Sequence, residues 1–121
     1  YLKKGSNKTF VILIAGMNDF MKTALYDADH NIIPFIINIK KNKGTLEFVG
    51  PICETTCKFI KYKKYQKLNQ SDFVAISDVG AYGASLSSNY NTKPLIAEII
   101  VKNSKARVIR KKQDIKNLLK Q

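Results

Sequence analysis

The chain has 121 residues, of which 45% are hydrophobic, so it can form one compact domain with a modest core and has no room for a second large one. No apolar run approaches the roughly 20 residues that cross a bilayer, and residues 10–15 lack the flanks of a signal peptide, so we expect a cytoplasmic chain with no membrane partner. The net charge of +12 rests on 19 scattered lysines and only two arginines. Since nucleic-acid readers use arginine forks and aromatic platforms, this charge favours a solvated surface and no nucleic-acid partner.

Four apolar segments follow one another in the first half of the chain. Residues 9–14 form a continuous apolar run that predicts a buried strand, and residues 18–28 have the apolar spacing of a short helix capped by Asn18 or Asp19. Residues 32–39 are rich in β-branched side chains and predict a strand, in which Pro34 indicates an edge position or a bend. Residues 45–49 predict a further strand that runs into a turn at residues 50–54.

The second half of the chain alternates basic, turn-forming and apolar segments. Residues 58–70 are rich in lysine and tyrosine and predict a basic loop with little core of its own, followed by a turn at 69–71 and a strand at 72–77. Residues 95–101 and 105–110 predict a hairpin, and residues 113–120 an amphipathic helical turn. Short strands with small helices predict a mainly β fold, a closed or nearly closed β-barrel or sandwich, in one domain over residues 1–121.

The two cysteines, Cys53 and Cys57, have no second pair of ligands near them, and His30 is the single histidine. We therefore expect no metal site, and in a cytosolic chain no disulfide. On composition alone, Cys53 could equally be a small buried hydrophobic side chain.

The turns that follow the predicted strands carry reactive side chains. Residues 50–54 hold a thiol and a carboxylate, and residues 80–91 hold two phenols between glycines, serines and asparagines. Turns lie at the surface and carry chemistry more often than they carry core. We interpret these two turns as half of an active site.

Four motifs in chain order resemble diaminopimelate decarboxylase, of the fold type III pyridoxal-phosphate decarboxylases. They are AGMND at 15–19, ALYDA at 24–28, GPICE at 50–54, and GAYG followed by SSNYN within 80–91. The ending ARVIR at 106–110 with its helical tail is similar to that family's C-terminus. The resemblance spans almost the whole chain.

The resemblance implies a C-terminal β-barrel/sandwich domain, normally attached to an N-terminal (β/α)8 barrel that is absent here and whose lysine holds pyridoxal 5′-phosphate. Because the chain begins with Tyr1 rather than Met, we expect it to be a fragment of that longer protein and to be inactive alone. The full bacterial enzyme would convert meso-2,6-diaminopimelate to L-lysine and CO2, the last step of lysine biosynthesis. It would act as a homodimer with active sites shared across the interface.

The resemblance also implies roles for individual residues. Cys53 would be the catalytic acid that protonates the carbon from which the carboxylate has left, and Glu54 would bind the distal ammonium of the substrate. Tyr82 would contact both cofactor and substrate, and Tyr26 would donate a hydrogen bond to the distal carboxylate of the substrate. Without the resemblance, Tyr82 could be a rim aromatic that plugs the barrel end, and Tyr26 a half-buried helix tyrosine.

The sequence departs from the family pattern at several positions. Lys22 stands where the family has a substrate-binding Arg, and we expect weaker substrate binding because Lys offers a point charge instead of two parallel bonds. Thr23 replaces the following proline, Cys57 replaces an Asp, and Ile14 stands where an Asp is common. These changes leave Cys53 and the other implied site residues in place.

Three alternatives remain, one within the decarboxylases and two from other classes. A related decarboxylase acting on ornithine or arginine would have Asp after the cysteine, so Glu54 favours diaminopimelate. A nucleic-acid-binding β-barrel would use the basic face of residues 58–67, with Tyr62 and Tyr65 interleaved. A purely structural dimerisation domain would have no catalytic need for Cys53.

Overall fold

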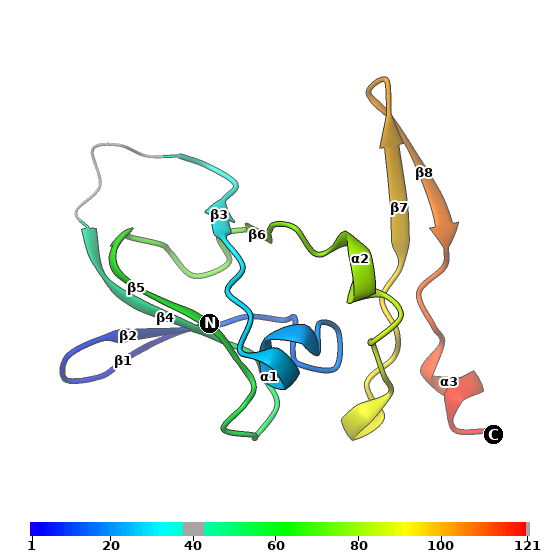
Figure 1. Cartoon of the computed structure of the whole chain (residues 1–121), viewed down its shortest axis with the longest axis horizontal. Coiled ribbons are helices and arrows are strands. Elements are labelled where there is room, and N and C mark those ends of the chain that lie inside the picture. The colour runs from blue at the N-terminus through cyan, green and yellow to red at the C-terminus, as the bar shows by residue number, and fades with distance from the viewer. Residues whose placement is uncertain (38–42, 121) are drawn as a thin grey trace.

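The computed structural model describes residues 1–37 and 43–120. Strands dominate these residues and helices are short, which confirms the expected mainly β class. Hydrogen bonds divide the described strands into three sheets: a four-stranded sheet in the order β1-β2-β4-β5, and two pairs, β3-β6 and β7-β8 (Figure 1). No helix among the described residues is long and apolar enough to cross a membrane.

The four-stranded sheet contains the centre of the core. Its strands are β1 (Leu2–Lys4), β2 (Thr9–Ile12), β4 (Lys43–Val49) and β5 (Lys58–Gln66), and the central β2–β4 pair is parallel, whereas both outer pairs are antiparallel. Val11 lies opposite Phe48, and Phe48 is fully buried, in edge-to-face contact with Tyr62 and Tyr65. Burial of these aromatic side chains stabilises the packing of β4 against β5.

The expected buried strand at residues 9–14 is shorter than predicted. Strand β2 ends at Ile12, although the Leu13 amide still donates to the Val49 carbonyl (2.8 Å). Ile14 is 94% exposed, so the end of the apolar run is not buried in this chain. An unbroken run of apolar residues does not by itself show that each residue is part of the core, because an exposed apolar surface can also be an interaction site.

The prediction of a basic loop at residues 58–70 is wrong. Residues 58–66 form β5, the longest strand among the described residues, in which Phe59 and Tyr65 are buried while the lysines are exposed. Shifts in register against β4 interrupt strict alternation, so the period-two pattern is hidden among the lysines. The hydroxyl of Tyr65 donates to the carbonyl of Ile32 (3.0 Å), which ties this strand to the second sheet.

The second sheet pairs β3 (Ile32–Pro34) with β6 (Val74–Ile76). Strand β3 has no other partner in the described residues, in keeping with the edge position indicated by Pro34. Residues 38 and 39 of the expected strand lie outside the described residues. The expected turn before β6 is present, with Ser71 in the left-handed region (φ 69°) and the Asp72 amide donating to the Asn69 carbonyl (3.2 Å).

The helix expected at residues 18–28 is reduced to α1 (Lys22–Tyr26), and the expected caps are wrong. Its N-cap is Met21, without a side-chain hydrogen bond, and Asp27 in the left-handed conformation (φ 51°) ends it. Asp19 instead accepts from the Gly16 amide (2.9 Å), and Asn18 is buried. Both side chains stabilise the preceding turn, which removes them from the helix.

The C-terminal part contains α2 (Gly80–Gly83), the 3-10 turn η1 (Tyr90–Thr92), and the expected hairpin of β7 (Glu98–Lys102) and β8 (Lys105–Arg110). Asn103 and Ser104 join the strands with φ of 49° and 59°, the backbone of a tight hairpin turn. The hairpin stands at the end of the molecule opposite β1 and β2 (Figure 1). Asp114 caps the last helix, α3 (Ile115–Leu118), through the Lys116 amide (3.0 Å), where an amphipathic turn was expected.

Candidate active site

Strand β4 leads into the turn of residues 50–57, which carries Cys53 and Glu54. The Gly50 amide donates to the Cys57 carbonyl (2.8 Å), and the Cys57 amide donates to the Glu54 carbonyl (3.1 Å), so backbone hydrogen bonds close the turn. Ile52 and Cys57 are buried as its anchors, whereas Cys53 and Glu54 are exposed. The exposure of Cys53 argues against its alternative role as a buried hydrophobic side chain.

A second turn, residues 15–19, packs against the first at two glycines. A Cβ atom on Gly50 would lie 2.8 Å from the Cα of Gly16 and would overlap the Sγ of Cys57. A Cβ atom on Gly16 would lie 3.1 Å from Ile52. Because neither side of this contact has room for a side chain, the glycines of AGMND and GPICE allow the close approach. The two motifs are therefore one structural unit.

The third motif segment, residues 80–91, reaches the same turn. The Ser88 amide donates to the Asn18 carbonyl (2.8 Å), and the ring of Phe20 lies 3.9 Å from the position of a Cβ on Gly83. Residues 16–20 thus contact both the Cys53 turn and the Tyr82 segment. Three stretches that are far apart in sequence therefore meet at this point.

Tyr82 has an uncommon backbone conformation and an open side chain. Its φ of 66° lies in the left-handed region, which is strained for a bulky residue and is found in turns and at functional sites. The side chain is 65% exposed, and no described atom lies within 4 Å of a Cβ built on the neighbouring Gly80. An exposed phenol beside open space does not fit a rim aromatic that plugs the domain.

Lys22 and Tyr26 lie at the two ends of α1. Tyr26 is 66% exposed, which argues against the alternative of a half-buried helix tyrosine. Within the described residues, no hydrogen bond joins Lys22, Tyr26 or Tyr82 to the Cys53 turn. The fold brings the segments together through backbone and glycine contacts and leaves their side chains open to a ligand.

One contact in the site involves Tyr90, the second phenol of residues 80–91, to which the sequence analysis assigned no individual role. The hydroxyl of Tyr90 in η1 donates a hydrogen bond to Oε1 of Glu54 (2.5 Å). The carboxylate that accepts this bond raises the pKa of Tyr90 above its ordinary value, because it favours the protonated phenol. The SSNYN motif contains Tyr90, but nothing in the motif indicates which side chain it faces.

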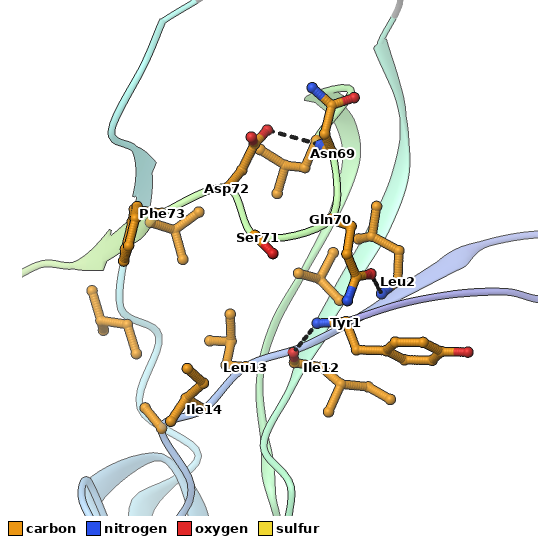
Figure 2. A pocket seen from close by; sticks show the side chains of 15 residues that line it. Tyr1, Leu2, Ile12, Leu13, Ile14, Asn69, Gln70, Ser71, Asp72 and Phe73 are labelled. Carbon is orange, nitrogen blue, oxygen red and sulfur yellow. Dashed lines mark hydrogen bonds between the residues drawn. The ribbon is translucent and has the colours of Figure 1, made fainter.

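A mainly apolar hollow of about 490 Å³ lies elsewhere, beside the start of the chain (Figure 2). Its lining comes from residues 1–2, 11–15, 68–74 and 76, and includes none of the five candidate site residues. The Tyr1 amino group donates to the Ile12 carbonyl (2.9 Å) at its edge, and Phe73 on its wall is 77% exposed. The candidate site residues therefore lie on the Cys53 turn and the short helices α1 and α2, and not in this hollow.

Comparison with known proteins gives the class to which this arrangement belongs. The family described as the pyridoxal-dependent decarboxylase, C-terminal sheet domain, matches residues 1–80, and the chain belongs to this family. The match confirms the resemblance drawn from the four motifs.

Within this family, the chain is similar to diaminopimelate decarboxylases. Diaminopimelate decarboxylase from Helicobacter pylori is 41% identical over 118 residues, and the one from Haemophilus influenzae is 36% identical over 118. The crystal structure of the Helicobacter pylori enzyme complexed with L-lysine superimposes with a TM-score of 0.89 at 40% identity, over 99% of this chain. The chain spans 28–29% of the length of these proteins.

Proposed function

We propose that the chain is the C-terminal domain of a diaminopimelate decarboxylase. The enzyme converts meso-2,6-diaminopimelate to L-lysine and CO2, the last step of lysine biosynthesis, in the bacterial cytoplasm. The observation that carries this proposal is the exposed Cys53–Glu54 pair on a turn fixed by Gly16 and Gly50, in a chain 41% identical to such an enzyme. Glu54, in place of Asp, favours diaminopimelate over ornithine or arginine as substrate.

Residues of this chain can contribute some of the contacts to a bound cofactor. The exposed phenol of Tyr82, which has no hydrogen-bond partner among the described residues, offers an aromatic face and a donor beside the open space at Gly80. Pyridoxal 5′-phosphate, when bound, withdraws electrons from the carbon that loses the carboxylate. We assign most of its binding, including the lysine that holds it, to an N-terminal (β/α)8 barrel that this chain does not contain.

Cys53 supplies the proton in this scheme. Its thiol is exposed at the tip of a turn whose backbone is closed by hydrogen bonds, so it can reach a reacting carbon outside its own domain with little loss of order. A thiol holds a proton near neutral pH and releases it to a nearby carbanion. Proton transfer from Cys53 therefore places a hydrogen on the carbon that has lost the carboxylate.

Substrate recognition divides between two elements. Glu54 provides a negative charge for the distal ammonium of the substrate, and Tyr26 and Lys22 on α1 provide a hydroxyl and a positive charge for its distal carboxylate. Lys22 binds a carboxylate as a point charge, which predicts weaker binding than an Arg would give. Both charged groups at the distal end of diaminopimelate then have a partner of opposite sign.

The exposure of Cys53 and Glu54 also supports a homodimer with shared active sites. Both side chains project from their own domain, so they can reach the cofactor of a partner subunit. The 121-residue chain alone should neither bind pyridoxal phosphate specifically nor release CO2. A cofactor absorbance band that survives dialysis of the chain would contradict this division of labour.

The test is product formation by the full-length protein that carries this chain, supplied with pyridoxal phosphate. We expect L-lysine and CO2 from meso-diaminopimelate, with ornithine and arginine turned over at least 100-fold more slowly. Preferential decarboxylation of ornithine or arginine would assign the chain to the related decarboxylases. Absence of all three activities in a protein that binds the cofactor would refute the proposed function.

A further inference from the structure

Tyr90 and Glu54 form a side-chain hydrogen bond that links the segment of residues 80–91 to the Cys53 turn. The two residues are 36 positions apart, and come from η1 and from the turn after β4. The bond occupies Oε1 of Glu54, and Oε2 has no hydrogen-bond partner in the part of the chain that the structure describes. One carboxylate oxygen is held, and the other is left to accept from a ligand.

The backbone around Tyr90 is fixed independently of Glu54. The Tyr90 amide donates to Oγ of Ser88 (3.3 Å), and the Ser88 amide donates to the carbonyl of Asn18 in the turn of residues 15–19. The side-chain amide of Asn89 donates to the Lys93 carbonyl (2.8 Å) and to Oε1 of Gln113 (2.5 Å). Ser88 and Asn89, just before η1, are therefore held both to the motif turn and to the segment before α3.

The two residues that follow Tyr90 have uncommon backbone angles. Asn91 and Thr92 have φ of 59° and 57°, in the left-handed region, which is unfavourable for the β-branched Thr92. The surrounding hydrogen bonds must offset this strain. In this conformation the Tyr90 hydroxyl faces the Glu54 carboxylate.

An exposed glutamate that binds substrate benefits from such a contact. A free Glu side chain samples many rotamers, and fixing it on binding costs conformational entropy. A neutral phenol that donates to the carboxylate restricts these rotamers without neutralising the charge. It thus pre-orders the group that meets the substrate's ammonium.

We propose that Tyr90 is a positioning residue that acts through Glu54 and so contributes to specificity for a substrate with a distal ammonium. The inference rests on the proposed function, in which Glu54 binds that ammonium. A tyrosine that only stabilised the fold would affect thermal stability and leave substrate affinity unchanged.

The test is a double-mutant cycle in the full-length holoenzyme with Tyr90→Phe, Glu54→Gln and the combined variant, assayed as L-lysine formation from meso-diaminopimelate. Tyr90→Phe removes only the hydroxyl, so we expect KM to rise about tenfold with kcat within twofold of wild type. In the Glu54→Gln background, Tyr90→Phe should change KM by less than twofold, because the residue through which it acts is already altered. Tyr62→Phe, which removes the hydroxyl that accepts a hydrogen bond from the Ile32 amide of β3, is the matched control and should lower thermal stability without raising KM.

A second readout does not depend on activity. The pKa of Tyr90, followed by NMR of ring-labelled tyrosine, should fall toward its ordinary value in Glu54→Gln. An unchanged KM in Tyr90→Phe, an effect that adds fully to that of Glu54→Gln, or an unchanged Tyr90 pKa would overturn this inference alone. A wild-type enzyme that makes no lysine would overturn the proposed function and this inference with it.

Discussion

Substitution of Gly50 by alanine tests the contact that joins the two motif turns. The added Cβ would lie 2.8 Å from the Gly16 Cα and 3.1 Å from the Ala15 carbonyl oxygen, and would overlap the Cys57 Sγ. Overpacking of a core contact costs about 1–3 kcal/mol, and the upper end applies here because two of the three obstructing atoms belong to the backbone. At roughly 3–5 °C per kcal/mol for a domain of this size, Tm should fall by roughly 10 °C.

Thermal unfolding followed by far-ultraviolet circular dichroism measures this effect. Gly44→Ala is the matched control, because no described atom lies within 4 Å of a Cβ at that position, and its Tm should stay within roughly 2 °C of wild type. Adding Cys57→Ala to Gly50→Ala removes the Sγ overlap and leaves the backbone contacts, so it should not restore Tm. Equal Tm values for Gly50→Ala and Gly44→Ala would refute the close approach of the two turns.

Three further predictions concern the core, pH and substrate affinity. Phe48→Ala should lower the free energy of unfolding by about 3–5 kcal/mol, seen as a lower denaturant midpoint with an unchanged m-value, since Phe48 is fully buried among aromatic rings. Burial raises the pKa of Tyr65 to about 12, so the folded state holds this proton more tightly than the unfolded state. Stability should therefore be retained below pH 10 and decline between about pH 10 and 12, and Tyr65→Phe should make this decline shallower in urea titrations at each pH. Lys22→Arg should lower KM for meso-diaminopimelate about three- to tenfold, because Arg can grip a carboxylate with two parallel bonds, and a KM that is unchanged would place Lys22 outside the substrate site.

The elements that the sequence predicted well are those with local signals. Strand β4 and the β7–β8 hairpin have strong β-propensity between turn residues, and the Asn103–Ser104 connection adopts the positive φ angles that such turns need. Strand β5 was missed because it is rich in exposed lysines, and because register shifts against β4 interrupt the regular alternation of buried and exposed residues between Phe59 and Tyr65. Asn18 and Asp19 were assigned to a helix start, but Asp19 accepts from the Gly16 amide and Asn18 is buried, so both belong to the turn before the helix.

In the candidate site, too, the local motifs could be recognised from the sequence, whereas the contacts between them could not. The family resemblance of the motifs assigned roles to Cys53, Glu54, Tyr26 and Tyr82, and the structure leaves all four side chains exposed. The bond between Tyr90 and Glu54 was beyond sequence reasoning, because it depends on three-dimensional contacts that bring η1 beside the turn after β4. Periodicity and turn chemistry report on neighbours in sequence, whereas such pairs arise only from the assembled fold.

The most direct test of the central claim is the rate of L-lysine formation at saturating meso-diaminopimelate in the full-length enzyme, compared between Cys53→Ala and Cys57→Ser. Cys53 is the exposed thiol that we assign as proton donor, whereas Cys57 is buried and accepts a hydrogen bond from the Met17 amide (3.4 Å), which a serine hydroxyl can also accept. We expect kcat to fall about 100-fold or more in Cys53→Ala, the contribution of a positioned general acid, and to stay within about threefold in Cys57→Ser. Turnover by Cys53→Ala equal to that of the wild type would contradict the account.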